Sequence, residues 1–473
     1  MTRVTRGGGQ ALHSRFKFPR GLYAQGRGDS PRALTRHPHV APPSQGSRHY
    51  HLKGFFHMYR FIVGMAVLTL LGVAPEAHAR RAPETLTISG KQLLINGQPF
   101  IAKGVNYQPV PRTGPSNWPD DWTMNRTVVF SDLAKMKEMG VNLIRVYVQY
   151  DRLFQNWDEQ NDPSSDPSRV DQTVLANYRA VLDEADRQGI YVLMNYFLPT
   201  SVDYRVGQQV KFNKDARTRH KLRFRNIINV FKNRTEFPMV LMWAFGNENN
   251  FEWNRGQMTS EAMFDFLGEA IREADQQADS AHPYTVVLGD NPQLDIHNTS
   301  LLNRAPLVDV WSINMYNTEQ GFKNIIQGYS LNKPLLFTEF GYDACQHNKG
   351  CDFSNPEGRG TQEAQLQQAA FYQSRWENTM LPNLSARSTA NKLLGGVVFE
   401  WNDEWWKDGA GPRDVHDTGG FSNANLTPDC FMNEEWFGLS TALKETETSG
   451  RYYRSAFTQL KKMWTAPGLT SAQ

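Results

Sequence analysis

Short apolar runs alternate with amphipathic stretches through most of the chain. Such runs predict strands buried on both faces, and they lie at 100–105, 141–148, 190–195, 240–245, 284–289, 308–316, 334–337 and 395–401. Between most of them, apolar residues recur at helical spacing, which predicts helices at 130–139, 170–188, 221–232, 260–278, 322–329 and 361–380. Only the connection 291–306 has a weak helical pattern. Eight such units predict one (β/α)8 barrel, or TIM barrel.

The residues that flank this repeat predict two further elements. Residues 86–100 alternate and carry turn signals at Ser-Gly and Asn-Gly, which predicts a short N-terminal β-hairpin. Residues 451–464 predict a C-terminal closing helix. A doubly wound open sheet is the alternative, but no glycine-rich phosphate loop follows the first strand. We therefore expect one α/β domain, a single TIM barrel, over residues 85–465.

The N-terminus has the pattern of an export signal. Residues 58–79 contain a basic start, an apolar stretch at 61–74 and a small-x-small cleavage site. The apolar stretch is shorter than the ~20 residues that a membrane-spanning helix needs. An uncleaved membrane anchor is the alternative. Residues 1–57 are rich in Gly, Pro, Ser, His and Arg, and we expect a disordered extension or a mis-assigned start, with Met58 as the initiator.

The charge and aromatic content bear on location and partners. Residues 1–79 hold 11 of the 51 Lys and Arg but only 2 of the 48 Asp and Glu, so the remaining chain is mildly acidic. A body with no basic stripe is not expected to bind nucleic acid. Aromatic residues make up 12% of the chain, including 12 Trp, which suits flat ligands such as sugar rings. We expect a monomer that is periplasmic or secreted, with no stable membrane anchor after cleavage.

The three cysteines suggest one disulfide. An exported protein meets an oxidising compartment, so one bridge and one leftover thiol are expected. Cys345 and Cys351 flank a short loop and are the first choice of pair, although either could join Cys430 instead. No metal-ligand spacing involves them, and the histidines are scattered in predicted helices and loops. We expect neither a metal nor a cofactor.

Two glutamates stand where predicted strands end. Glu248 follows the fourth strand and Glu339 follows the seventh. The carboxyl ends of the strands form the catalytic face of a TIM barrel, and no core requires a carboxylate there. A pair of carboxylic acids is the minimum equipment for cleaving a glycosidic bond. Carboxyls ~5 Å apart would allow a covalent intermediate, whereas ~6.5–9.5 Å would admit a water and invert configuration.

At these residues the chain resembles the clan A retaining β-glycosidases. This group includes β-galactosidase-type barrels, cellulase-type barrels and β-1,3-glucanosyltransferases, and the resemblance covers most of 85–410. An Asn precedes the acid/base in that group, as Asn247 precedes Glu248. The sequences at 103–109 and 142–147 look most like the glucanosyltransferases, and Phe-Glu-Trp at 399–401 looks like bacterial β-glycosidases. The sequence at 195–197 departs from the glucanosyltransferase pattern.

The resemblance implies roles for these residues. Glu248 would be the acid/base and Glu339 the nucleophile. Six further residues would bind substrate or support the pair: Asn247 at the sugar 2-hydroxyl, Tyr316 as a donor to the nucleophile, Arg145 as a fixed positive charge near it, Trp401 as the aromatic floor under the sugar, and Asn195 and Tyr107 at neighbouring strand ends. Arg145 has a structural alternative, a barrel-interior charge paired with a neighbouring acid.

The sequence therefore predicts an exported retaining β-glycosidase or transglycosylase that cleaves a β-linked glucan. The partner would be a polysaccharide or oligosaccharide. Aromatic residues of the long loops could hold an acceptor sugar: Trp118, Trp122, Trp253, Trp405 and Trp406. Two alternatives remain, a non-catalytic polysaccharide-binding barrel and a β-mannan or β-galactoside hydrolase of the same clan. A metal-dependent hydrolase would need a His/Asp cluster at the strand ends, which the sequence lacks.

Overall fold

The computed structural model describes residues 81–108, 126–154, 170–199, 209–210, 214–250, 259–291, 296–345, 359–404, 421–422, 431–441 and 451–469. All of them belong to one unit, Ala79–Gln473. The predicted extension at 1–57 and the predicted signal peptide at 58–79 lie outside the described residues. Among the described helices, none has the length and apolar character that crossing a bilayer would need.

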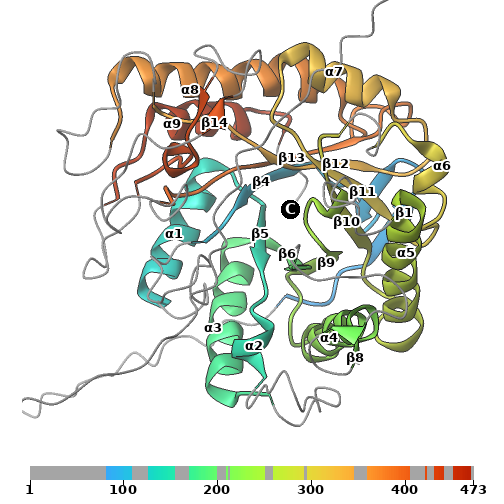
Figure 1. The fold of residues 1–473 in the computed structure, drawn as a ribbon. Helices are drawn as coiled ribbons and strands as arrows, with labels where there is room; N and C mark the ends of the chain where they lie inside the picture. The colour runs from blue at the N-terminus through green and yellow to red at the C-terminus, as the bar shows by residue number, and fades with distance from the viewer. Residues whose placement is uncertain are drawn as a thin grey trace, which may run out of the picture. The chain divides into compact units, whose positions relative to one another are not determined.

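Eight parallel strands close into a barrel, which confirms the predicted fold (Figure 1). They are β4 (Ala102–Asn106), β5 (Leu143–Tyr147), β6 (Tyr191–Tyr196), β9 (Val240–Phe245), β10 (Tyr284–Gly289), β11 (Val310–Asn314), β12 (Leu335–Phe340) and β13 (Leu393–Val398). Neighbours along the barrel are neighbours in sequence, and β13 pairs with β4 to close it. The predicted strands differ from these only at their ends.

Helices cover the outside of the barrel. The long ones are α1 (Arg126–Met139), α3 (Gln172–Gln188), α4 (Ala216–Phe231), α5 (Ser260–Gln277), α7 (Glu319–Gly328) and α8 (Gln362–Arg375), and short ones are α2 (Tyr150–Leu153) and α6 (Thr299–Leu302). Several begin where the sequence supplies an oxygen for the free N–H groups: the side chains of Asp171, Thr259 and Thr361 accept hydrogen bonds at the starts of α3, α5 and α8. The connection 291–306, whose helical pattern is weak, contains only the single helical turn of α6.

Two apolar clusters fill the domain. The larger lies between the strands and the surrounding helices, and the smaller contains the barrel interior. Leu143 and Leu193 belong to the interior cluster, whereas Ile144 and Met194 belong to the outer one. This alternation follows the period of two along a strand. It also aims the residues two positions beyond Leu143 and Leu193 into the barrel, where the candidate site lies.

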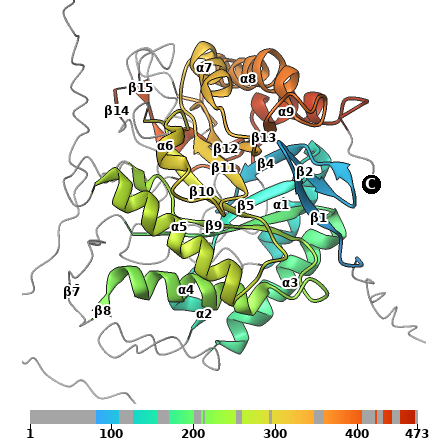
Figure 2. The ribbon, with the colours of Figure 1, turned by 90° about the vertical axis from the view of Figure 1, so that its right-hand side faces the viewer.

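The N-terminal sheet and the last helix close the fold as predicted. Strands β1 (Leu86–Ser89), β2 (Gln92–Ile95) and β3 (Gln98–Pro99) form an antiparallel sheet, and side chains of Leu93 and Ile95 join the interior cluster at the strand starts. Helix α9 (Ser455–Trp464) packs against α8 and α1. Figure 2 shows β1 and β2 on one side of the domain and the short pairs β7–β8 (Gln209–Val210, Lys214–Asp215) and β14–β15 (Phe421–Ser422, Phe431–Met432) on the other.

Candidate active site

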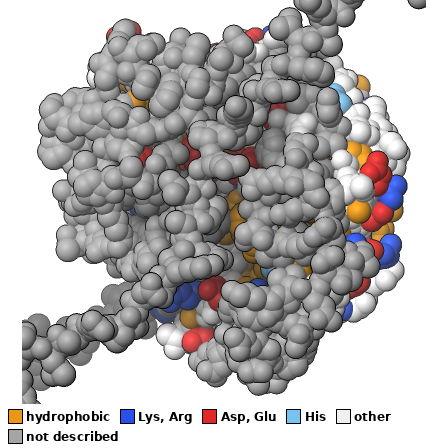
Figure 3. Space-filling view, viewed as in Figure 1, with side chains coloured by type: hydrophobic (Ala, Val, Ile, Leu, Met, Phe, Trp, Pro, Cys, Tyr) orange, Lys and Arg blue, Asp and Glu red, His pale blue; other side chains and the backbone are white. Residues whose placement is uncertain are grey.

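The site lies at the carboxyl ends of the barrel strands, on the face that Figures 1 and 3 present. Acidic side chains of described residues are visible near the middle of this face in Figure 3. Glu248 reaches it through a sharp turn after β9. Gly246 has φ +84° and Glu248 itself has φ +54°, a left-handed conformation that non-glycine residues seldom adopt. The Glu248 N–H donates to the Val287 carbonyl, which ties the turn to β10.

Glu339 is the next-to-last residue of β12, and its side chain is nearly buried. Both carboxylate oxygens accept a short hydrogen bond. Arg145 Nη1 donates to Oε1 at 2.6 Å, and the Tyr316 hydroxyl donates to Oε2 at 2.7 Å. One of these donors carries a full positive charge, and hydrogen bonds from a charged donor are the stronger kind. The sequence left two interpretations of Arg145: an interior charge paired with an acid, or a positive charge near the nucleophile candidate. Because the acid that pairs with Arg145 is Glu339, both interpretations describe the same contact.

Arg145 is fully buried, and side chains from four strand ends fix its guanidinium. Nε and Nη2 donate to Asn195 Oδ1 at 2.9 and 2.8 Å, and Nη1 also donates to Asn106 Oδ1 at 3.1 Å. Nη2 further donates to Tyr147 and to Asn247 Oδ1, at 2.9 and 2.8 Å. Burial opposes the charge, but Tyr147 and Glu339 outweigh it and raise the pKa of Arg145. The guanidinium is thus a fixed cation that cannot rotate away from Glu339.

Asn314, the last residue of β11, connects the two glutamates. Its Nδ2 donates to Glu248 Oε1 at 2.8 Å and to Asn247 Oδ1 at 3.1 Å, while its Oδ1 accepts from Thr338 Oγ1. A continuous chain of contacts therefore runs from Glu339 through Arg145, Asn247 and Asn314 to Glu248. The chain holds the two carboxyls in one rigid network.

The two carboxyls have different electrostatic surroundings. Burial raises the pKa of Glu248 to about 7, and the negative charge of Glu339 acts in the same direction, while the hydrogen bond from Asn314 opposes the change. Burial and Glu339 also raise the pKa of Tyr316 well above its ordinary value, so this hydroxyl remains a donor. Near neutral pH Glu248 can therefore carry the proton that a general acid needs, whereas Glu339 lies against the fixed cation Arg145. Such different surroundings are what acid and nucleophile roles require.

The structure brings together six of the eight residues chosen from the sequence: Glu248, Glu339, Asn247, Arg145, Tyr316 and Asn195. Asn195 is fully buried and its Oδ1 accepts from Arg145, so it supports the guanidinium. Sequence reasoning missed Asn106, Tyr147 and Asn314. Each is the last residue of its strand, and a polar residue ending a buried strand is the signal that could have identified them.

Two of the sequence-based choices do not reach the site. Tyr107 is fully buried, and its hydroxyl donates to Asp132 Oδ2 of α1, which also pairs with Arg451. Trp401 is fully buried as well, with its ring 5.8 Å from Tyr453 and 6.2 Å from Phe457 of α9. Both residues lie beyond the end of their strand, β4 or β13, and both side chains contact the surrounding helices, α1 and α9.

The aromatic wall beside the nucleophile is formed by other rings. Phe399, the first residue after β13, meets Tyr316 edge-on at 6.2 Å, and Phe437 meets Tyr316 at 5.8 Å. Phe399 and Phe437 also contact each other, at 5.7 Å. These contacts fix the phenol that donates to Glu339. The loop aromatics Trp118, Trp122, Trp253, Trp405 and Trp406 lie outside the described residues.

Among the described residues, no group of three or more His, Cys, Asp or Glu side chains is placed to hold a metal ion. Cys345 is disulfide-bonded and packs against Trp436. Its partner, Cys351 or Cys430, lies outside the described part of the chain, so the pairing with Cys351 stays a prediction.

Comparison with known proteins identifies the family of this chain. The cellulase family, glycosyl hydrolase family 5, matches residues 95–378. The chain belongs to glycosyl hydrolase family 5. Membership in this family confirms the resemblance to clan A β-glycosidases. The match runs from the end of β2 to just beyond α8, and therefore covers the barrel strands from β4 to β12.

Individual relatives of this family 5 chain are distant. A 1,3-beta-glucanosyltransferase, GAS4 of Saccharomyces cerevisiae, is 21% identical over 278 residues, which cover 54% of this chain and 52% of the relative. Among solved structures, the β-D-glucuronidase of Dictyoglomus thermophilum has a TM-score of 0.50 at 18% identity, covering 82% of this chain and 55% of that one. The Ruminococcus gnavus β-glucuronidase has a TM-score of 0.49 at 16% identity, covering 80% and 53%. The chain spans about half the length of these relatives, and the likeness to the Dictyoglomus structure concerns the fold alone.

Proposed function

We propose that this family 5 chain is a retaining β-glycosidase or transglycosylase, with Glu339 as the nucleophile and Glu248 as the acid/base. The observation that carries the proposal is that the two carboxyls have different hydrogen-bond partners and different electrostatic surroundings. Arg145 and Tyr316 bind both oxygens of Glu339, whereas burial and the charge of Glu339 raise the pKa of Glu248 to about 7. One site thus holds a carboxyl fixed by two donors beside a carboxyl that can carry a proton near neutral pH.

In the first step, Glu339 would attack the anomeric carbon while Glu248 donates its proton to the leaving glycosidic oxygen. A bond forms between Glu339 and the sugar as the bond to the leaving group breaks, giving a covalent glycosyl enzyme. The hydrogen bonds from Tyr316 and Arg145 orient the Glu339 carboxylate for the attack and stabilise its negative charge. The Asn247 Oδ1 is occupied by Arg145 and Asn314, which leaves its Nδ2 to donate to the sugar 2-hydroxyl.

In the second step, Glu248, now ionised, would take a proton from the incoming hydroxyl as that oxygen attacks the anomeric carbon. The sugar–Glu339 bond breaks and Glu339 returns as a carboxylate. Two inversions give net retention of configuration. A water molecule as acceptor gives hydrolysis, and a sugar hydroxyl gives transglycosylation, so the two glutamates are compatible with both outcomes.

The proposed substrate is a β-linked glucan. Two comparisons support it: the family is described as cellulase, and the Saccharomyces relative is a 1,3-beta-glucanosyltransferase. Because that relative is only 21% identical, the linkage is not assigned. A β-mannan or β-galactoside hydrolase would use the same glutamates. A non-catalytic barrel that binds polysaccharide would not need a network that binds both oxygens of one carboxyl while the pKa of the other is raised to about 7.

A product survey tests this function. We expect β-1,3-, β-1,4- or β-1,6-linked gluco-oligosaccharides to be converted, with the β-anomer appearing first by ¹H NMR. At millimolar substrate, mass spectrometry should also show products longer than the substrate, because a retained glycosyl enzyme can be captured by a second sugar. An α-anomer as the first product would contradict a retaining mechanism. Chains that only shorten, at every acceptor concentration, would contradict transglycosylation.

We further propose that the protein is exported and that the mature chain begins near Arg80, after the signal at residues 58–79. N-terminal sequencing of the protein recovered from the periplasm or the medium tests this. A mature N-terminus near Arg80 is the expected result. A protein with an intact Met1 or Met58 that fractionates with the membrane would support the alternative, an uncleaved anchor.

A further inference from the structure

The turn that carries Glu248 is followed by two buried asparagines, Asn249 and Asn250. Glu248 has φ +54°, and a non-glycine residue persists in this left-handed conformation only where the surrounding structure holds it there. The side chains of both asparagines form hydrogen bonds with backbone groups on either side of the turn, as the distances below show. The two residues are therefore placed to stabilise the conformation of Glu248.

Asn249 fixes the turn on the side of β6. Its Oδ1 accepts from the Asn247 N–H at 2.9 Å, and its Nδ2 donates to the carbonyl of Leu198, which follows β6, at 3.0 Å. A Cβ on Gly246 would lie 2.4 Å from this Oδ1, so the close approach of Asn249 requires a glycine there. The start of the turn is thus attached to the segment after β6.

Asn250 fixes the turn on the side of β10. The pairing of β9 with β10 ends at Phe245, before the turn. Beyond it, the Asn250 side chain forms two hydrogen bonds with the backbone of Gly289: Nδ2 donates to the carbonyl at 2.8 Å, and Oδ1 accepts from the N–H at 2.7 Å. A side-chain amide has the same donor and acceptor groups as a peptide bond. Asn250 therefore continues the contact with β10 after the backbone of β9 has turned away.

Gly289 connects this contact to the carboxyl of Glu248. In the pairing of β10 with β11, Gly289 lies opposite Asn314. Asn314 Nδ2 donates to Glu248 Oε1 at 2.8 Å. Asn250 therefore binds the backbone beside the residue whose side chain binds Glu248, and a displacement of the turn would change the position of the Glu248 carboxyl relative to Asn314.

We propose that Asn250 is a positioning residue for the acid/base, which holds the turn against Gly289 so that the Glu248 carboxyl reaches the leaving glycosidic oxygen. The inference rests on the function proposed above. A general acid must lie within hydrogen-bond reach of the atom that receives its proton, so a small displacement of the turn reduces this proton transfer. The attacking carboxylate is held by Arg145 and Tyr316, which lie outside the turn.

The test measures kcat/KM of Asn250→Ala on two substrates, since kcat/KM reports the first chemical step. For a β-linked gluco-oligosaccharide, whose leaving oxygen needs a proton, we expect a loss of roughly 10- to 100-fold, the size of effect that a small misplacement of a reacting group produces. For an aryl β-glucoside with an acidic leaving group, the loss should stay below about threefold, because no proton is needed. Asn250→Asp keeps the acceptor for the Gly289 N–H, and we expect a smaller loss with the same dependence on the substrate.

The Glu248→Ala background separates positioning of the acid from general support of the fold. If Asn250 acts through Glu248, adding Asn250→Ala to Glu248→Ala should lower kcat/KM by less than about threefold on either substrate, because residues that act through one group are not additive. A residue that only supports the fold would lower the activity of both backgrounds to a similar degree.

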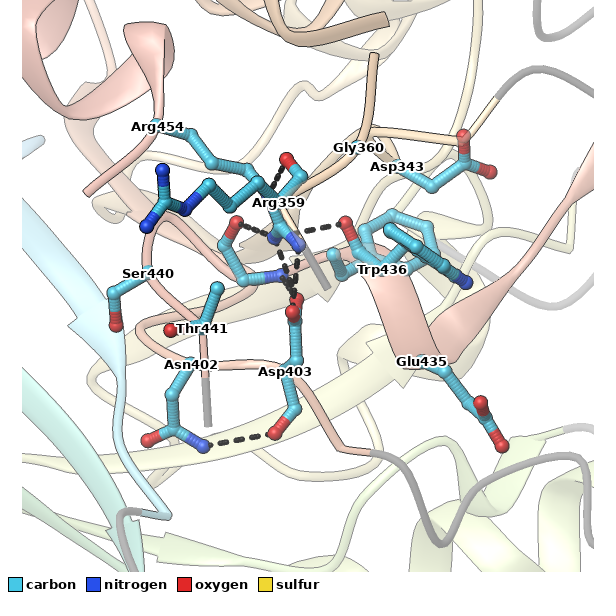
Figure 4. Close-up of polar contacts among 12 residues, drawn as sticks. Asp343, Arg359, Gly360, Asn402, Asp403, Glu435, Trp436, Ser440, Thr441 and Arg454 are labelled. Carbon is cyan, nitrogen blue, oxygen red and sulfur yellow. Dashed lines mark hydrogen bonds and ion pairs between the residues drawn. The ribbon is translucent and has the colours of Figure 1, made fainter. Parts of the chain in front are cut away.

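A buried ion pair on the opposite side of the barrel supplies the matched control (Figure 4). Arg454, directly before α9, donates from Nη1 and Nη2 to the two oxygens of Asp403, each at 2.6 Å, and both side chains are fully buried. Asp403 follows β13, which lies opposite β9 in the barrel. Asp403→Asn keeps the shape and weakens the pair, so the melting temperature should fall while any loss of kcat/KM is the same for the two substrates.

Three outcomes would overturn the positioning role of Asn250. They are equal losses on the two substrates, no loss on either, and a further large loss in the Glu248→Ala background. Failure of the proposed function has a different result: Glu248→Ala itself would then not distinguish the two substrates. The two failures can therefore be told apart.

Discussion

Glu339→Ala should lose β-glucan hydrolysis by at least roughly 10⁴-fold in kcat, and azide should restore part of the turnover. The substitution removes the attacking oxygen and leaves a space between Arg145 and Tyr316, the two donors that bind the carboxylate in the native enzyme. A small anion can enter that space and attack the anomeric carbon once. The expected product is therefore a glycosyl azide of inverted configuration, which ¹H NMR identifies.

Glu339→Gln is the matched control for this rescue. Its amide keeps the volume of the native side chain, so we expect an equally inactive enzyme that azide does not restore. Circular dichroism and the melting temperature should show that both variants are folded, because Arg145 retains Asn106, Asn195 and Asn247 as partners. Wild-type turnover by Glu339→Ala would disprove the assignment of the nucleophile.

Glu248→Ala should affect substrates according to their leaving group. For natural glucans, whose leaving oxygen needs a proton, we expect a loss in kcat/KM of roughly 10²- to 10⁴-fold. For aryl glycosides with acidic leaving groups, the first step needs no proton and should be nearly preserved. Azide should accelerate the second step of this variant and give a product of retained configuration, opposite to that of Glu339→Ala.

The pH profile adds a second readout for Glu248. Burial together with the charge of Glu339 raises its pKa to about 7, and the acid must be protonated to act, so wild-type kcat/KM should fall as the pH rises above about 7. Glu248→Ala should abolish this alkaline limb. Equal losses on activated and natural substrates, or an unchanged limb, would contradict the acid/base role.

Much of the fold follows from local patterns. A strand that is buried on both faces must be apolar throughout, and a helix that covers it must be apolar at every third or fourth position. These two periods are visible in a single sequence, so the eight strands and the long helices were predicted with errors only at their ends. The two glutamates were also visible, because each interrupts or follows an apolar run where no core needs a charge.

The residues around the glutamates were harder to predict. Arg145 was recognised as a charge within a strand, but its partners come from four other strands that are far away in sequence. Asn314 was not recognised as the end of a strand, because the predicted strand continued to residue 316 and placed Asn314 within it. Phe437, which contacts Tyr316, lies in a segment without periodicity, so its sequence did not predict its position.

The amino-acid sequence by itself determined the barrel and the pair of glutamates, since both depend on the order of apolar and polar residues within one strand and its loop. Tertiary structure alone decided which aromatic ring stands beside the nucleophile. Beyond the last barrel strand the period of two no longer fixes side-chain direction, and packing against α9 buries Trp401 while Phe399 and Phe437 contact Tyr316. Tertiary structure also set the unequal surroundings of Glu248 and Glu339, because burial and distant charges act through space and not along the chain.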